Sequence, residues 1–333
     1  MNYIGSKLKL SPFLVEVIGE TVGELSDKVF CDLFAGTGIV GRTFKPRVRT
    51  VIANDIEHYS YVLNRHYIGN NRPLDAYPYL EALDTLAPRE GFIYRHYTRE
   101  GHGERQYFSS ENARKIDAVR MEIEVMRRDG RIDEDLYYLL LCSLIESADK
   151  VANTASVYGA YLKKLKKSAA AELRLEAAEY DCAGEGHRVY REDANRLIRR
   201  ISGDILYLDP PYNHRQYGAN YHLLNTLALY DDFVPRGKTG LRDYVRSDYC
   251  QRKKVAAAFE DLIAEARFSH IFLSYNNEGL MSAEEVREIM ERYGEYRLRT
   301  IAYQRFKADR SENRRHKADA TVEYLHILKK ERI

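Results

Sequence analysis

Residues 205–213 constrain the fold of this chain more than any other stretch of its sequence. An apolar, strand-like run at 205–208 ends at Asp209, and Pro210, Pro211 and Tyr212 follow. Because proline has no N–H donor and holds φ at about −65°, the strand must end at Pro210. What remains is a cluster of acceptors without competing donors: the Asp209 carboxylate and the Pro210 carbonyl, next to the flat face of Tyr212.

Such a cluster suits an exocyclic amino group on a nucleobase. The amino nitrogen of adenine or cytosine is a weak nucleophile because its lone pair is delocalised into the ring. Two acceptors that take its hydrogens favour a tetrahedral nitrogen, which can displace an electrophilic methyl group in line without a covalent enzyme intermediate. Flipping the base out of a duplex costs a few kcal/mol, and stacking on Tyr212 returns about 1–3 kcal/mol. The alternative interpretation is a Pro-Pro loop after a core strand, with a surface aspartate.

The composition is typical of a soluble protein of about two domains. The chain has 333 residues, 44% of them hydrophobic and 31% charged, and its net charge is only +2. A nucleic-acid site must therefore come from local clusters of basic residues. Cys31, Cys142, Cys182 and Cys250 form no C-x-x-C pair, which argues against a zinc site and a disulfide framework. Without a signal peptide or a membrane-length apolar run, we expect a cytoplasmic protein that binds no metal and no membrane.

The order of predicted elements indicates an α/β fold with a doubly wound parallel sheet. Two further strands, at about 296–306 and 321–329, indicate a terminal antiparallel hairpin around a very basic connection. Apolar runs predict the remaining strands at 29–34, 50–53, 189–190, 205–208 and 270–274, and helical periodicity predicts helices at 9–25, 40–44, 194–200, 222–230 and 255–266.

The segment from 61 to 187 interrupts this pattern and indicates an inserted, mainly helical domain. Helices are predicted at 111–128, 133–148 and 163–179, and a loop or hairpin between Gly91 and Gly103. We therefore divide the chain into a first catalytic part at 1–60, the insert at 61–187, and a second catalytic part at 188–333.

A glycine-containing segment, Phe34-Ala35-Gly36-Thr37-Gly38, follows the first predicted strand. Its glycines let the backbone approach a ligand at the sheet edge where such folds bind nucleotides, although a simple tight turn is the alternative. Since the segment is not G-x-G-x-x-G, a dinucleotide cofactor is disfavoured.

Two carboxylates follow further strands and have two interpretations each. Asp55 can accept both hydroxyls of a ribose, or cap the helix that starts at Glu57. Asp193 can hold an adenine edge, or cap the helix at 194–200. At the N-terminus, Tyr3 offers an aromatic face and Lys7 a charge for a carboxylate, whereas the alternative there is a frayed terminus.

The order of these motifs resembles that of the alpha group of DNA adenine methyltransferases. Residues 2–7, 34–38, 54–55, a helical insert and 209–212 follow one another as in that family, over nearly the whole chain. The resemblance implies S-adenosylmethionine as methyl donor, a Rossmann-like seven-stranded sheet with a reversed terminal hairpin, and a target-recognition region in the insert. It also implies a prokaryotic or phage-encoded enzyme that modifies duplex DNA in a restriction-modification system, beside a cognate endonuclease.

The resemblance further implies roles for individual residues. Asp209 and the Pro210 carbonyl hold the target amino group, in one motif with Pro211, and Tyr212 stacks on the flipped base. Asp55 takes the ribose hydroxyls, and Asp193 contacts the adenine of the donor. The donor site as a whole comprises Tyr3, Ile4, Gly5, Lys7, Phe34, Ala35, Gly36, Gly38, Asp55, Ile56, Asp193 and Asp209.

Basic clusters are expected to contact phosphates and to make DNA binding salt-dependent, although a solvated charged surface is the alternative for each. Asn213, His214, Arg215 and Gln216 are expected to fill the gap left by the flipped base or to contact its partner. The basic residues are Lys163, Lys164, Lys166 and Lys167; Arg236, Lys238, Arg242, Arg246, Arg252, Lys253 and Lys254; and Arg305, Lys307, Arg310, Arg314, Arg315 and Lys317. The candidates for base reading in the insert are Asn153, Arg95, Arg99 and Arg105.

Other functions remain open at the level of sequence. The acceptor cluster tolerates the amino group of cytosine, and the substrate could be RNA rather than duplex DNA. A non-catalytic nucleic-acid-binding relic predicts a damaged pocket, whereas Gly36, Gly38, Asp55, Asp209 and Tyr212 are all present. A nuclease activity on the same chain is disfavoured, because the assigned segments leave no length for it.

Overall fold

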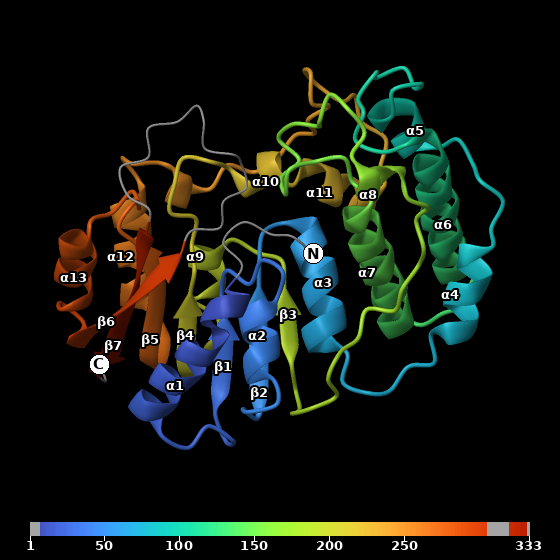
Figure 1. The fold of residues 1–333 in the computed structure, drawn as a ribbon. Coiled ribbons are helices and arrows are strands. Elements are labelled where there is room, and N and C mark those ends of the chain that lie inside the picture. The colour runs from blue at the N-terminus through green and yellow to red at the C-terminus, as the bar shows by residue number, and fades with distance from the viewer. Residues whose placement is uncertain (1–6, 305–319, 332–333) are drawn as a thin grey trace. The chain divides into compact units, whose positions relative to one another are not determined.

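A seven-stranded sheet, counted within the described residues, organises one of two compact units in the chain (Figure 1). The computed structural model describes residues 7–304 and 320–331. The sheet unit comprises Lys7–Ile56, Ala183–Gln216 and Val245–Ile333, and the helical unit comprises Glu57–Cys182 and Tyr217–Tyr244. Several predicted site residues lie outside the described residues: Tyr3, Ile4, Gly5, Arg305, Lys307, Arg310, Arg314, Arg315 and Lys317.

The strand order of the sheet is β3-β2-β1-β4-β5-β7-β6. The first five strands run parallel, whereas β7 runs antiparallel to both β5 and β6. The predicted doubly wound sheet and its terminal hairpin are therefore confirmed. The strands are β1 (Val29–Asp32), β2 (Thr50–Asn54), β3 (Arg188–Tyr190), β4 (Ser202–Leu208), β5 (Arg267–Asn276), β6 (Gly294–Gln304) and β7 (Ala320–Lys330).

Alternating side chains of the strands cover both faces of the sheet. On one face, Phe30 stacks on Phe44 of α2 with ring centroids 4.4 Å apart, and Tyr207 lies on the same side. On the other face, Cys31 and Leu206 join the core formed with α9, α12 and α13. The helices of this unit are η1 (Leu8–Leu10), α1 (Ser11–Val22), α2 (Ile39–Phe44), α9 (Ala194–Leu197), η3 (Asp248–Cys250), α12 (Val255–Glu265) and α13 (Ala283–Met290).

Two of these helices differ from the sequence expectation. α9 ends at Leu197 rather than at residue 200. α13 was not predicted, although Ser282 and Glu285 form a capping box at its start, in which each side chain accepts the other residue's backbone N–H. That Ser-x-x-Glu spacing before an apolar stripe is a signal by which the helix could have been found.

The helical unit has its own hydrophobic core, built mainly on α6 and α7. Residues 217–244 pack in this unit, although the sequence division places them in the second catalytic part. The predicted helices at 111–128, 133–148 and 222–230 are confirmed. The elements are α3 (His58–Asn64), the π-helix η2 (Arg65–Gly69), α4 (Tyr77–Asp84), α5 (Phe92–Tyr97), α6 (Ser110–Arg128), α7 (Glu134–Lys150), α8 (Lys167–Ala170), α10 (Tyr217–Asn220) and α11 (His222–Leu229).

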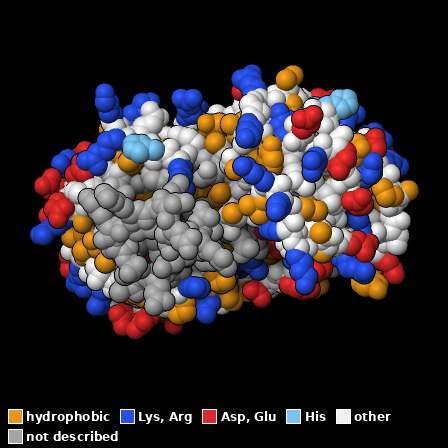
Figure 2. All heavy atoms as spheres, turned by 45° about the horizontal axis from the view of Figure 1, so that its top comes forward, with side chains coloured by type: hydrophobic (Ala, Val, Ile, Leu, Met, Phe, Trp, Pro, Cys, Tyr) orange, Lys and Arg blue, Asp and Glu red, His pale blue; other side chains and the backbone are white. Residues whose placement is uncertain are grey.

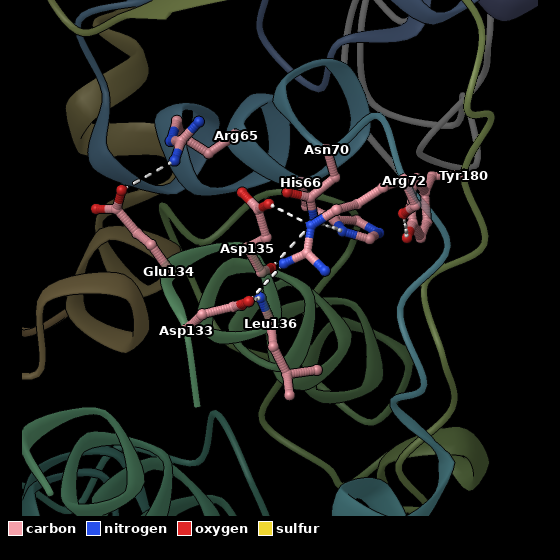
Figure 3. Close-up of polar contacts among 9 residues, drawn as sticks. All are labelled: Arg65, His66, Asn70, Arg72, Asp133, Glu134, Asp135, Leu136 and Tyr180. Carbon is pink, nitrogen blue, oxygen red and sulfur yellow. Dashed lines mark hydrogen bonds and ion pairs between the residues drawn. The ribbon is translucent and has the colours of Figure 1, made fainter. Parts of the chain in front are cut away.

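Polar contacts at the start of α7 join it to the preceding segments (Figure 3). The Asp133 carboxylate accepts the backbone N–H of Leu136 at 2.9 Å and so caps the helix. Arg72 forms ion pairs with Asp133 and, at 3.2 Å, with Asp135, while its carbonyl accepts the Tyr180 hydroxyl at 2.6 Å. We infer a structural role for this cluster, because its charged side chains are engaged with one another and with the start of α7.

The predicted helix at 163–179 is wrong, since only the short α8 forms there. The chain after α8 is extended, and side chains of neighbouring elements satisfy its backbone groups in place of a helical ladder. The Asn112 amide donates to the carbonyls of Ala169 and Ala171 and accepts from Leu173 N–H. The Ser143 hydroxyl accepts from Ala178 N–H. These partners come from helices distant in sequence, so local composition does not report them.

The predicted loop between Gly91 and Gly103 is also wrong in its first half, which forms α5. The buried Asp117 carboxylate of α6 accepts the N–H groups of Gly91, Ile93 and Tyr94 at 2.8–2.9 Å, and the Tyr230 hydroxyl at 2.6 Å. A buried carboxylate thus supplies the partners that the first N–H groups of a helix lack.

Replacing Asp117 with alanine is expected to destabilise the helical unit by about 3 kcal/mol, because it leaves buried donors without a partner. Amide hydrogen exchange should accelerate in α5 first, and the thermal unfolding midpoint should fall. The matched control is Asp129→Ala at the exposed end of the same helix, which should change neither quantity. Unchanged exchange in α5 upon Asp117→Ala would show that the carboxylate does not hold this helix.

Candidate active site at the carboxyl edge of the sheet

The polar residues predicted to form the site gather at the carboxyl ends of the parallel strands. From β1 the chain continues to β2 and β3 on one side, whereas β4 and β5 lie on the other. The edge between β1 and β4 is therefore the topological switch point, where ligands bind in open α/β sheets. Asp32 ends β1, Asn54 ends β2, and Asp209 follows β4 directly.

The glycine-containing segment forms a tight loop between β1 and α2. Gly36 and Gly38 both have positive φ, +53° and +75°, a conformation that glycine adopts without strain. The N–H of Gly36 donates to the Asp55 carboxylate at 2.9 Å, and that of Gly38 donates to the Ala35 carbonyl at 2.7 Å. Asp55 thus supports the loop, and the N-cap residue of the following helix is Glu57, whose own side chain forms no cap.

Asn54 is a site residue that the sequence analysis left without a role. Its buried amide donates to the carbonyls of Leu33 and Glu192, at 3.1 Å each, and accepts the N–H of Glu192 at 3.0 Å. The side chain therefore ties together the segments that follow β1 and β3. The signal was present in the sequence, since a polar residue ends an otherwise apolar strand.

Asp32 was also missed, and it is the buried acid nearest the loop along the chain. One carboxylate oxygen accepts Gly41 N–H from α2 at 3.1 Å. The other, Oδ1, is buried and has no hydrogen-bond partner among the described residues. Burial raises the pKa of Asp32 to about 8. The residue is therefore a buried acid with a vacant acceptor beside the glycine loop.

Lys7 lies between two carboxylates from opposite parts of the sheet unit. Its ammonium is 3.2 Å from Asp209 Oδ1 and 3.7 Å from Glu323 Oε2, and its side chain is only 5% exposed. Burial alone would lower the pKa of Lys7, but the carboxylates of Asp209 and Glu323 outweigh burial and raise it. The ammonium is therefore charged, and it fixes the orientation of Asp209. A carboxylate partner was predicted for Lys7 from the sequence, whereas Glu323 was not among the predicted residues.

Asp209 itself has a perturbed acidity. Burial raises its pKa to about 6, the Glu323 carboxylate acts in the same direction, and Lys7 opposes both. The ammonium of Lys7 lies on the Oδ1 side of this carboxylate, at 3.2 Å.

The loop after Asp209 holds Tyr212 in a fixed position. The Tyr212 carbonyl accepts Leu280 N–H at 2.9 Å, and its ring packs edge-on against Tyr275 at 6.4 Å between centroids. Pro210 is buried, whereas Pro211 and Tyr212 are partly exposed. Phe34 of the glycine-containing segment packs edge-on against Tyr249, with ring centroids 5.0 Å apart.

The remaining candidate site residues of the sheet unit differ in exposure and in their hydrogen-bond partners. Asp193 is exposed and caps α9 by accepting Arg196 N–H at 3.0 Å, and Ile56 is partly buried. The carboxamide of Gln216 both accepts from and donates to the backbone of Ser247, at 2.9 and 3.4 Å, so this side chain braces the loop. His214 and Arg215 are exposed, next to Asn213, whose side chain accepts Arg215 N–H at 2.9 Å.

Two of the four base-reading candidates in the helical unit have structural partners instead. Asn153 is fully buried, and its carboxamide bonds the backbone of Gln106, Leu162 and Lys166 at 2.9–3.0 Å. It therefore cannot reach a base, and this prediction is wrong. Arg105 donates to two backbone carbonyls. Arg95, Arg99, Lys163 and Lys164 are exposed.

Membrane-spanning helices and metal-binding clusters are both absent from the described residues. No helix there is long and apolar enough to cross a membrane. Nor do three or more His, Cys, Asp or Glu side chains group there in a way that could hold a metal ion.

Comparisons with known proteins agree on one family. Residues 3–289 match the model of the D12 class N6 adenine-specific DNA methyltransferases. The chain is 64% identical to the type II methyltransferase M.NlaIII of Neisseria lactamica, over 99% of both chains. It is 37% identical to the type II methyltransferase M.CviAII of Paramecium bursaria Chlorella virus 1, over 92% of this chain and 93% of that protein. It is 40% identical to the type II methyltransferase M.FokI of Planomicrobium okeanokoites, where it spans 53% of the relative's length.

Proposed function

Because this chain belongs to the D12 class N6 adenine-specific DNA methyltransferases, we propose that it methylates the exocyclic amino group of adenine within one short sequence of duplex DNA. The observation that carries the proposal is the Lys7–Asp209 pair at the switch point of the sheet. The similarity to type II methyltransferases supports a role in protecting host DNA against a cognate restriction endonuclease.

The edge of the sheet fits S-adenosylmethionine as the methyl donor. When bound, this cofactor supplies an electrophilic methyl group. The glycine loop at Gly36 and Gly38 leaves room for close approach of a ligand to the backbone, and Asp55 stands at its end to accept ribose hydroxyls. The vacant oxygen of Asp32 would accept a hydrogen bond from the cofactor's ammonium group. Phe34, Ala35, Ile56 and Asp193 are the further residues that we assign to this pocket.

The acceptor cluster acts on the target amino group. Lys7 lies 3.2 Å from Oδ1 of Asp209, and the carboxylate and the Pro210 carbonyl would accept the two hydrogens of the amino group. The nitrogen lone pair is then directed out of the plane of the base, toward the methyl group. Because these acceptors are already oriented before the reaction, they need no rearrangement at the transition state.

Tyr212 would hold the flipped base by stacking. Its carbonyl is fixed by Leu280 and its ring is supported by Tyr275, while the residue stays partly exposed. The adjacent exposed residues, His214 and Arg215, would contact the DNA from which the base has left. Pro211, in the same loop, restricts the backbone between the acceptors and the stacking ring.

The pKa of Asp209 predicts the acid limb of the activity profile. The acceptor role requires the carboxylate form, and a pKa of about 6 means that this form is lost as the pH falls through 6. We expect kcat/KM for the methyl donor to fall about tenfold per pH unit below that value, since kcat/KM reports groups of the free enzyme. Initial rates between pH 5 and 8 measure this. A flat profile over the range would contradict the assigned role of Asp209.

Single-molecule sequencing of DNA from cells that express the protein tests the proposed function. We expect modified adenines in one short sequence motif, and none in cells that express the Asp209→Ala variant. Unmodified DNA, or modification spread over unrelated sequences, would contradict site-specific methylation by this chain.

A further inference from the structure

A closed turn in the helical unit has features that the proposed reaction does not explain. Arg236 and Leu241 exchange backbone hydrogen bonds of 2.8 Å in both directions and so close a four-residue tip. Gly237 and Gly240 in this tip have positive φ, +65° and +72°. Between them, Lys238 is exposed, and Thr239 is partly buried.

Two side chains from the segment around α5 hold the turn by its glycine carbonyls. The Tyr97 hydroxyl donates to the Gly240 carbonyl at 2.7 Å, and the Arg105 guanidinium donates to the Gly237 carbonyl at 3.1 Å. Tyr97 is fully buried. A Cβ added at Gly240 would lie 2.9 Å from Arg105 Nε and 2.9 Å from Tyr97 Cε1. The turn therefore packs directly against these two side chains. These contacts hold the side chain of Arg105, a candidate base reader, against the turn.

The charges around the turn are unevenly compensated. Arg236 pairs with Asp243 at 2.9 Å, and Arg242 pairs with Asp231 at 2.9 Å. By contrast, Lys238 and Arg105 form no ion pair within the described residues, and the second hydrogen-bond partner of Arg105 is the carbonyl of His96. The positive charges of Lys238, at the tip, and of Arg105, which donates to the Gly237 carbonyl, therefore have no anionic side chain as a partner among the described residues.

Further exposed basic residues of the same unit favour a polyanion over a single small anion. Arg95, Arg99, Lys163 and Lys164 are exposed on segments of the same unit. Figure 2 shows Lys and Arg side chains spread among Asp, Glu and hydrophobic ones over the right half of the view, rather than collected in one pocket. Lysine is a compact, hydrated point charge of the kind that contacts phosphates.

We propose that the turn between Arg236 and Leu241 is a phosphate-contacting element for duplex DNA, with Lys238 as the contacting side chain and Arg105 as a positioning residue. This inference rests on the proposed function, because that function supplies the duplex. It extends that function by narrowing the phosphate contacts expected of the basic cluster at 236–254 to one closed turn between α11 and η3, and by adding Arg105 as the residue that positions it. Tyr97 supports the turn beside Arg105.

Equilibrium binding of a duplex at several salt concentrations tests the contact. Lys238→Ala should weaken binding about tenfold at low salt and lower the slope of log K against log salt by about 1, since one phosphate contact is lost. Gly240→Ala removes no charge but displaces the turn, and should produce the same two changes. Arg105→Met should do so as well. The control is Arg128→Ala, at the exposed end of α6, which should bind as the wild type does.

Steady-state kinetics separate this role from a merely structural one. Each turn variant should raise KM for DNA about tenfold and leave kcat within twofold, with an unchanged thermal midpoint for Lys238→Ala. Wild-type binding and slope in Lys238→Ala would overturn the contact, and wild-type behaviour of Gly240→Ala and Arg105→Met would overturn the positioning. If the wild-type protein methylates adenine while no turn variant differs from it, the inference fails and the proposed function stands. If the wild type neither binds nor methylates a duplex, the proposed function fails first.

Discussion

Replacing Asp209 with alanine is expected to lower kcat for methyl transfer by about a thousandfold, while the Kd for duplex DNA changes by less than about threefold. The variant removes the carboxylate that would accept a hydrogen from the target amino group, but leaves the stacking ring of Tyr212 and the basic surface in place. The fold should survive, because Lys7 keeps its second partner, Glu323, 3.7 Å away. Single-turnover rates and a fluorescence binding assay measure the two quantities.

Two comparisons make this result specific. Asp209→Asn keeps the size of the side chain and removes its charge, so it should be nearly as inactive as Asp209→Ala. Asp27→Ala removes an exposed carboxylate of the same unit and should keep full activity. If Asp209→Ala retains more than a tenth of the wild-type kcat, the amino group is held by other acceptors and the assignment is wrong.

Replacing Lys7 with methionine is expected to lower kcat/KM at neutral pH by about a hundredfold and to move the acid limb of the profile to higher pH. Lys7 is the group that opposes the rise in the pKa of Asp209, which burial and Glu323 cause. Without the ammonium, the pKa of Asp209 rises above 6, and the carboxylate form is lost over a higher pH range. Part of the lost activity should therefore return at pH 8.5.

Lys9→Met is the matched control for this variant. Lys9 is the same residue type two positions along the chain, but it is exposed. The Lys9→Met variant should leave both kcat/KM and the acid limb of the pH profile unchanged. A Lys7→Met enzyme that is slow at every pH, with its acid limb still near pH 6, would show that Lys7 acts on the cofactor or the fold rather than on Asp209.

The features predicted from the sequence are those that local patterns encode. The apolar run at 205–208 forms the buried end of β4, and the strand ends before Asp209 and its two prolines, as predicted. The hairpin of β6 and β7 follows from two adjacent strand patterns. These elements, together with the parallel order of β1 to β5, were sufficient to place Asp55 and Asp209 at one edge of the sheet.

The features that were missed depend on partners distant in sequence. Glu323 reaches Lys7 only because β7 pairs with β5 in the finished sheet. The segment after α8 has the composition of a helix, yet Asn112 and other side chains of the helical unit hold it extended. Arg105 and Asn153 have the residue types of base readers, but backbone carbonyls near them in the fold engage both. The residue type indicates what a side chain can bind, whereas the fold determines which partners lie within its reach.

Nucleoside analysis of a methylated duplex tests the central claim most directly. Purified protein, S-adenosylmethionine and duplex DNA that contains the recognised sequence are incubated, and the digested nucleosides are separated by mass. We expect N6-methyladenine as the product of the wild-type protein, and no N6-methyladenine with Asp209→Ala. N4-methylcytosine as the product, or N6-methyladenine formed equally well by Asp209→Ala, would contradict that claim.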